Sequence, residues 1–183
     1  MIHVEQIHHV AYRCNDARET VEFYQKYLNM DLLVCIAEDH VPSTKEPDPY
    51  MHVFLDAGQG NILAFFEITG SPPMDRDRNT PKWVQHIAFR VGNTESLIAA
   101  KAELVSKGLD VIGVTDHGII QSIYFFDPNG HRIELTCVTG TSEQMKKLKA
   151  VAPAMLDEWS QTKKPPRHSA WLHEDEFSKK PGS

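Results

Sequence analysis

Hydrophobic and polar residues alternate in short segments along the chain, and longer segments carry the three- to four-residue apolar spacing of helices. The alternating or continuously apolar segments predict strands, which are expected at residues 3–13, 31–38, 50–57, 61–69, 83–91, 109–114, 119–126 and 131–138. A helical segment follows the first strand, and another follows the fifth. Polar residues suited to helix caps come just before these helices: Asn15 and Asp16 in one case, Asn93 and Thr94 in the other.

The chain contains an internal repeat. The segment HVAYRCNDARETVEFYQKYLNM from His9 aligns with HIAFRVGNTESLIAAKAELVSKG from His86, and each reads as a strand, a cap and a helix. The segment FFEIT around Glu67 matches RIELT around Glu134, and each closes a set of short strands. Residues 70–82, between the two halves, are rich in Pro, Gly and charges, which is typical of a linker.

This order of elements predicts the fold class and the domain limits. We expect an α+β fold built from two β-α-β-β-β modules, with module one at residues 3–69 and module two at residues 83–138. Neither module can bury its own sheet alone, so residues 1–140 are expected to form one domain. Residues 141–183 are expected to hold a helix, despite Pro153, and then an arm or disordered tail.

Strand parity indicates which histidine of the HH pair has a function. Adjacent side chains of a strand leave opposite faces, so His8 and His9 cannot share one. His9 recurs as His86 in the second half, whereas His8 does not recur. The same alternation, applied to the segments around Glu67 and Glu134, is interpreted as placing both glutamates on the face of the two repeated histidines. All four side chains are then expected to point into one cup.

Two carboxylates beside two imidazoles are costly to bury unless a cation neutralises them. Two imidazole nitrogens with one or two carboxylates suit zinc, nickel, iron(II) or manganese better than magnesium or calcium, and they leave positions open for substrate or water. We therefore predict one divalent metal ion, bound by His9, His86 and Glu134 with Glu67 as a fourth ligand. His8 is interpreted as a structural neighbour.

Three motifs resemble the vicinal oxygen chelate superfamily, which includes glyoxalase I, methylmalonyl-CoA epimerase, extradiol dioxygenases and the fosfomycin and bleomycin resistance proteins. The motifs are HHVAYRCNDARETVEFY, QHIAFRV and SIYFFDPNGHRIELT, and the resemblance covers residues 3–138. It implies paired modules that form a U-shaped mixed sheet around a metal ion, often in a homodimer. His9, His86 and Glu134 match the superfamily's metal positions, and Glu67 matches the additional glutamate of glyoxalase I.

The resemblance implies an enzyme whose metal binds two neighbouring oxygen atoms of a small substrate. The first expectation is a glyoxalase- or epimerase-like lyase or isomerase, dependent on a metal such as nickel, zinc or cobalt. Such an enzyme moves a proton next to a carbonyl group, and Glu134 or Glu67 would be both ligand and base.

An extradiol ring-cleavage dioxygenase is the main alternative, because two histidines and one carboxylate form the facial triad of non-haem Fe(II) enzymes. Tyr124 matches their active-site tyrosine and is a candidate catalytic residue, although a strand aromatic lining the cup is an equally simple explanation. Against this alternative, Asn61 stands where those enzymes place a catalytic histidine, and His117 approximates a second one only after an alignment shift. A metal-independent drug-binding protein is the third possibility, but it would not need two buried carboxylates facing two histidines.

Charge and composition limit the partners. A formal net charge of −6 with scattered Lys and Arg predicts no nucleic-acid and no membrane partner. Arg13, Arg90 and Arg132 lie on the predicted ligand faces and are candidates for binding an anionic group of a small-molecule substrate. Three cysteines without metal-like spacing, no leader pattern and no long apolar run indicate a cytoplasmic protein.

Overall fold

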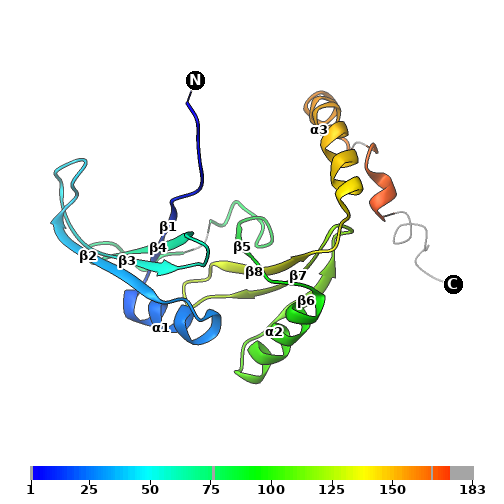
Figure 1. The fold of residues 1–183 in the computed structure, drawn as a ribbon. Helices are drawn as coiled ribbons and strands as arrows, with labels where there is room; N and C mark the ends of the chain where they lie inside the picture. Colours follow the sequence, from blue (N-terminus) through cyan, green and yellow to red (C-terminus); the bar gives the residue numbers. More distant parts are fainter. Residues whose placement is uncertain (1, 76, 166, 174–183) are drawn as a thin grey trace. The chain divides into compact units, whose positions relative to one another are not determined.

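The structure is a computed structural model that describes residues 2–75, 77–165 and 167–173 of the 183-residue chain. The elements follow one another in the order β1 (His9–Cys14), α1 (Ala17–Leu28), β2 (Leu32–His40), β3 (Pro47–Asp56), β4 (Ile62–Ile68), β5 (His86–Arg90), α2 (Thr94–Ser106), β6 (Ile112–Asp116), β7 (Ile120–Phe126), β8 (Arg132–Val138), α3 (Ser142–Thr162) and η1 (Ala170–His173) (Figure 1). The order β-α-β-β-β occurs twice, which confirms the predicted α+β class.

The observed boundaries differ most from the predicted ones at the two ends of the chain. β1 begins at His9 rather than at residue 3, and residues 2–8 are exposed without regular structure up to that point. α3 runs through Pro153, as expected. The predicted tail contains the short helix η1, while its residues 174–183 lie outside the described part of the chain. No helix in the described ranges is long and apolar enough to cross a membrane.

The chain divides into two compact units. The first consists of Met1–Ile87 and Phe126–Ile133, and the second consists of Ala88–Phe125 and Glu134–Ser183. The first sheet lies wholly in the first unit. The proposed limit of one domain at residue 140 stays a prediction.

The first sheet has the strand order β1-β4-β3-β2, in which β1 and β4 are parallel and the other pairs are antiparallel. Asp16 is the N-cap of α1, and its carboxylate accepts a hydrogen bond from the backbone N–H of Glu19 at 2.8 Å. α1 packs on β3 and β4, where the Tyr24 and Phe65 rings lie 5.2 Å apart. The apolar side chains buried in this unit include Val21, Tyr24, Val53, Leu55, Leu63 and Phe65. This packing leaves the opposite face of the sheet without a helix in the first unit.

The second sheet has the strand order β5-β8-β7-β6. The Asn93 side chain caps α2 by accepting the Ser96 N–H at 2.9 Å. α2 is joined to β7 by the hydrogen bond from Thr94 Oγ1 to Gln121 Oε1, at 3.0 Å. Apolar side chains buried in this unit are Leu97, Leu104, Ile123, Phe125, Leu135 and Cys137. Alternation along β7 and β8 therefore leaves their remaining side chains on the face away from α2.

The DPNG turn between β7 and β8 is tight, and it is tied to α1 within the first unit. The Asp127 carboxylate is 5 % exposed and accepts the backbone N–H groups of Asn129 and His131 at 2.9 and 2.8 Å. Its other oxygen accepts the hydroxyl of Tyr24 at 3.1 Å. One buried carboxylate thus joins the turn to the helix.

Candidate metal and substrate site

His9 lies on the face of the first sheet that α1 does not cover. The side chain is exposed, and its ring centroid is 6.5 Å from that of His52 and 6.0 Å from that of Phe54, both on β3. The His52 ring stacks on Phe66 of β4 with centroids 3.5 Å apart. His8 is exposed, and its Nδ1 is 2.8 Å from the Nδ1 of His9. His9 therefore stands beside a wall of aromatic and imidazole rings.

His52 is not among the residues that the sequence predicted for the site, and its nearness to His9 was missed. Its side chain is only 9 % exposed, and burial lowers its pKa, with a further contribution from His9. Its Nε2 has no hydrogen-bond partner among the described residues. Because burial disfavours the charged form, His52 contributes a neutral imidazole to this face. The alternation of β3, which puts His52 and Phe54 on one face, was the available signal.

Glu67 lies on the opposite face from His9, so the prediction that these two side chains share a face is wrong. The parallel register pairs Glu67 with Cys14, a buried residue on the α1 side of β1. Alternation along β4 also puts Glu67 on the face of Phe65, which packs under α1. Its Oε2 accepts the N–H of Ala17, the first residue of α1, at 2.7 Å. This carboxylate stabilises a helix N-terminus.

The alignment of the two repeats explains why the sequence predicted the wrong sheet face for Glu67. Counting from the glycine in each hairpin turn pairs Ala64, rather than Glu67, with Glu134. The same count pairs Glu67 with Cys137, whose Sγ lies 3.8 Å from the hydroxyl of Thr94, the first residue of α2. Both members of this second pair thus lie beside the start of their module's helix. Matching the two glutamates by residue type shifted the alignment by three positions.

Glu134 lies on the face of the second sheet away from α2, as predicted. The side chain is 4 % exposed, and its Oε1 accepts the hydroxyl of Ser122 at 2.5 Å. The Thr136 hydroxyl lies 3.0 Å from the same Ser122 oxygen. The Ser122 hydroxyl thus orients the carboxylate, and Thr136 in turn contacts Ser122. A buried carboxylate in such surroundings is suited to a cationic ligand.

Tyr124 lies two residues from Ser122 on β7 and therefore shares the face of Glu134. Its side chain is 6 % exposed, and its hydroxyl is 2.8 Å from His117 Nε2, on the turn after β6. An imidazole hydrogen-bonded to a phenol can pass a proton in either direction. Tyr124 was predicted from the sequence, Ser122 was not, and His117 matched a catalytic position only after an alignment shift.

His86 begins β5, where it is exposed, and its ring orientation suits metal binding. Its Nδ1 is 2.9 Å from the backbone oxygen of Val84. A carbonyl oxygen can only accept, so Nδ1 carries the proton and the ring's lone pair is on Nε2. Histidines that bind metals commonly donate their other ring N–H in this way.

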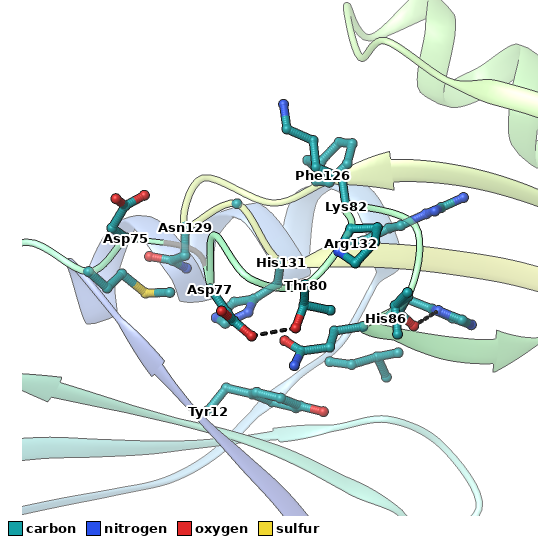
Figure 2. Close-up of a pocket in the computed structure, with 16 residues that line it drawn as sticks. Tyr12, Asp75, Asp77, Thr80, Lys82, His86, Phe126, Asn129, His131 and Arg132 are labelled. Atoms are coloured by element: carbon teal, nitrogen blue, oxygen red, sulfur yellow. Dashed lines mark hydrogen bonds between the residues drawn. The ribbon is translucent and has the colours of Figure 1, made fainter.

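A cavity of about 770 Å³ lies within the first unit, between β1, the segment before β5 and the β7–β8 turn (Figure 2). Its lining comprises Tyr12, Met74, Asp75, Asp77, Thr80, Pro81, Lys82, Val84, Gln85, His86, Ile87, Phe126, Asn129, Gly130, His131 and Arg132. The carboxylate of Asp75 forms an ion pair with Arg78 at 2.6 Å. Two carboxylates, Asp75 and Asp77, and two cationic side chains, Lys82 and Arg132, line the cavity, and the cationic side chains offer contacts for an anionic group of a small molecule.

The three arginines predicted to bind substrate lie in different surroundings. Arg132 lines the cavity. Arg13 donates from Nη2 to the backbone oxygen of Pro72 in the linker, so its guanidinium holds the linker against β1. Arg90 is exposed at the end of β5. The structure therefore brings only Arg132 of the three to the cavity.

The predicted metal ligands are divided between the two units. His9, Glu67 and His86 belong to the first unit, and Glu134 belongs to the second. Within the described residues, no three His, Cys, Asp or Glu side chains gather in a group that could hold a metal ion. The ligand set stays a prediction.

Two β-α-β-β-β modules, each with one helix on a four-stranded sheet, define the class of fold. The family model described as Glyoxalase/Bleomycin resistance protein/Dioxygenase superfamily matches residues 6–135. The chain belongs to this superfamily. α3 and the residues after it lie beyond the matched segment.

Three similar proteins indicate the range of activities in the superfamily. The putative ring-cleaving dioxygenase MhqA of Bacillus subtilis (strain 168) is 29% identical over 137 residues, 73% of this chain, and the chain spans only 40% of that relative. The metallothiol transferase FosB of Shouchella clausii (strain KSM-K16) is 34% identical over 122 residues, 58% of this chain and 80% of that relative. A structure of a point mutant of the fosfomycin resistance protein FosX from Listeria monocytogenes, with Mn(II) bound, is 20% identical with a TM-score of 0.53, and the match covers 79% of this chain and 100% of FosX. The superfamily thus includes enzymes of different reaction classes, and a metal ion is bound in the FosX structure.

Proposed function

We propose that this protein is a divalent-metal-dependent enzyme in which His9, His86 and Glu134 hold the metal ion. The observation that carries the proposal is the carboxylate of Glu134, which is buried and is oriented by Ser122 on the face away from α2. The superfamily match supports it. Glu67 is left out of the ligand set because its carboxylate is bonded to the start of α1.

The reaction that these residues support best is oxygen-dependent cleavage of a dihydroxylated aromatic ring. Two imidazoles with one carboxylate are the ligand set of non-haem Fe(II) oxygenases. The relative MhqA, described as a putative ring-cleaving dioxygenase, supports this choice. When bound, the metal ion would act as a Lewis acid that holds two neighbouring substrate oxygens. Both atoms of one O2 molecule would enter the ring-opened product.

The protein's own groups would move protons and hold the substrate. The Tyr124 hydroxyl, hydrogen-bonded to His117, would take a proton from a substrate hydroxyl and return it to the product. The rings of His52 and Phe54 beside His9 offer a flat apolar wall for an aromatic substrate. Arg132 would bind a negatively charged substituent.

A glyoxalase- or epimerase-like lyase or isomerase is the second candidate. The observation that favours it is the placement of Tyr124 and His117, a proton-transferring pair, on the same unit as the buried Glu134. Since Glu67 faces α1, Glu134 would have to be both metal ligand and base in this reaction. The metal would then be nickel, zinc, cobalt or manganese, and no oxygen would be consumed.

One experiment separates these two reactions. The metal-free protein is loaded separately with Fe(II), Mn(II), Ni(II), Co(II) and Zn(II), and oxygen uptake is followed with catechol as the substrate. We expect uptake with Fe(II) or Mn(II) that is abolished in the Tyr124→Phe variant without loss of metal binding. An absence of uptake with every metal, together with anaerobic turnover of a methylglyoxal–thiol adduct, would favour the lyase.

We also propose a cytoplasmic homodimer. The three cysteines are all free thiols, which fits a reducing compartment, and the superfamily often forms dimers. Sedimentation of the chain at several concentrations would test the dimer. A mass that stays at 20.8 kDa would contradict it.

A further inference from the structure

The chain reverses direction after α3, and a short segment returns to the second unit's β-sheet. The C-cap of α3 is Lys163, whose backbone is left-handed with a φ of 55°, and η1 follows a few residues later (Figure 1). We call residues 167–173 the C-terminal strap. The family match ends at residue 135, so the strap lies outside the matched segment.

The C-terminal strap contacts the turn between β6 and β7 at Gly118. A Cβ atom added to Gly118 would lie 3.1 Å from the backbone oxygen of Leu172 and 3.5 Å from the Leu172 Cβ and Cδ2 atoms. Gly118 has a φ of 81°, and its N–H donates to Asp116 Oδ1 at 2.7 Å, so this turn uses the left-handed conformation that glycine adopts readily. Because Gly118 has no side chain, the half-buried Leu172 packs directly on the backbone of the turn.

The residue before Gly118 is His117, whose ring is hydrogen-bonded to Tyr124. The His117 N–H donates to the backbone oxygen of Ile120 at 2.9 Å, which closes the turn. The ring Nε2 is 2.8 Å from the Tyr124 hydroxyl. The contact with the C-terminal strap is therefore one residue away from the imidazole of this pair.

The same turn is also held on its other side. The backbone oxygen of Ile119 accepts the N–H groups of Thr139 and Gly140, just after β8, at 2.9 and 2.8 Å. These bonds fix the end of the turn next to β7. The end that carries His117 is contacted by Leu172 through Gly118.

The strap has one ionic contact with α3, which is weaker than the packing of Leu172. His168 Nδ1 lies 3.8 Å from Glu158 Oε2, and the two side chains are 37 % and 45 % exposed. An ion pair that is this long and this exposed contributes little. The apolar contact of Leu172 is therefore expected to be the main restraint that the strap places on the turn.

We propose that Leu172 is a positioning residue that keeps the His117 ring in hydrogen-bond contact with the Tyr124 hydroxyl. The inference rests on the proposed function for the catalytic use of this pair. A proton is transferred efficiently only when the two groups are about 2.6–3.2 Å apart, so a small displacement of the turn interrupts the transfer. Leu172 acts through Gly118 and the backbone of the turn.

The first test measures the turn in the full-length chain without substrate or metal. Leu172→Ala removes the side-chain atoms that pack on Gly118, and Leu156→Ala removes the same atoms from a side chain of α3 that is 65 % exposed. We expect amide hydrogen exchange at His117 to become at least about fivefold faster in Leu172→Ala and to stay within about twofold of wild type in Leu156→Ala. Leu172→Met retains a long apolar side chain and should restore slow exchange.

The imidazole provides a second readout. Nitrogen-15 NMR of the histidine-labelled protein follows Nε2 of His117, and the Tyr124→Phe variant identifies the change in this signal when the phenol is removed. We expect the signal in Leu172→Ala to move in the same direction as in Tyr124→Phe. In Leu156→Ala it should stay at the wild-type position.

Catalysis provides the third readout, in the catechol assay of the proposed function. Leu172→Ala should lower kcat at least about fivefold and change KM by less than about twofold. This split is expected because Arg132 and the rings beside His9, which would bind the substrate, lie in the first unit and are unaffected.

Equal exchange at His117 in wild type, Leu172→Ala and Leu156→Ala would overturn the inference. An equal acceleration in both leucine variants would also overturn it, because it would reflect a general loosening of the chain. An active wild type with an unchanged kcat in Leu172→Ala would do the same. Far-ultraviolet circular dichroism on the same samples shows that the variants are folded. If the wild type binds no metal and consumes no oxygen, the proposed function is lost, while exchange and the His117 signal still decide whether Leu172 positions this ring.

Discussion

Two glutamates in similar sequence surroundings have different partners in the structure. Glu67 accepts a backbone N–H at the start of α1, where the helix dipole favours a negative charge. Glu134 is buried among hydroxyl groups on the face away from α2. A residue type and its immediate neighbours therefore do not define a ligand, because a shift of one position changes the face of a strand.

Paired amide substitutions separate the two roles. Glu67→Gln should lower the free energy of unfolding by about 1 kcal/mol, because a charge-assisted hydrogen bond becomes a neutral one. It should leave metal affinity unchanged. Glu134→Gln should lower metal affinity by at least about tenfold, since it removes a charged ligand. Isothermal titration with Mn(II) and thermal unfolding measure both effects. An equal loss of affinity in the Glu67 variant would restore it as a ligand.

The three thiols should differ in reactivity. Burial raises the pKa of Cys14 to about 11, with the hydrogen bond to Thr20 acting in the opposite direction. Cys137 is fully buried, whereas Cys35 is exposed on β2. We expect a maleimide to modify Cys35 rapidly in the native protein and the two others only after denaturation. Mass spectrometry of the labelled peptides gives the answer, and rapid labelling of Cys14 would contradict the structure.

The raised pKa of Cys14 predicts that the stability of the protein depends on pH. The unfolded Cys14 thiol ionises near pH 9.0, while the folded one keeps its proton to about pH 11. The unfolded state thus binds fewer protons in this range, so the free energy of unfolding should fall as the pH rises from 9 to 11. Below pH 9 the Cys14 thiol is protonated in both states, so the folded protein has its full stability with respect to this group. Urea denaturation across this range, with Cys14→Ala as the control that flattens the slope, would measure it.

At the scale of helices and strands, periodicity located nearly all elements within a few residues. It succeeded where each element has one buried face, as in β8, whose Leu135 and Cys137 face α2. It failed for residues 3–8, which are exposed and lie outside any strand although Val4 and Ile7 are apolar. Alternation predicts that a segment can pair as a strand, but pairing also requires a neighbouring strand that extends equally far.

The β7–β8 turn should be a main source of stability in the first unit. Asp127→Ala would leave the Tyr24 hydroxyl and two backbone N–H groups without their buried acceptor, and about 3 kcal/mol of unfolding free energy should be lost. Asp127→Asn retains one acceptor oxygen and should lose less. Chemical denaturation of both variants would test this order, and equal losses would show that one neutral acceptor oxygen cannot replace any part of the carboxylate's contribution.

At the scale of the whole molecule, the superfamily fold and the C-terminal helix should be separable. A chain that ends at Gly140 retains both sheets and the matched segment, and FosX is covered completely by a match to 79% of this chain. We expect it to keep its metal affinity within about twofold. A control that ends at Lys163 should have the same affinity. Loss of metal binding on removal of α3 would mean that the domain extends beyond residue 140.

The sequence alone determined the repeated β-α-β-β-β order, the superfamily and the histidine of the HH pair that the first sheet presents away from α1. These properties depend on local periodicity and on motifs that need no knowledge of distant contacts. Only the tertiary structure decided the face of Glu67, the contact of His9 with His52 and the pairing of His117 with Tyr124. Each of these depends on the register between strands, which is set by the packing of whole elements against one another rather than by any single segment.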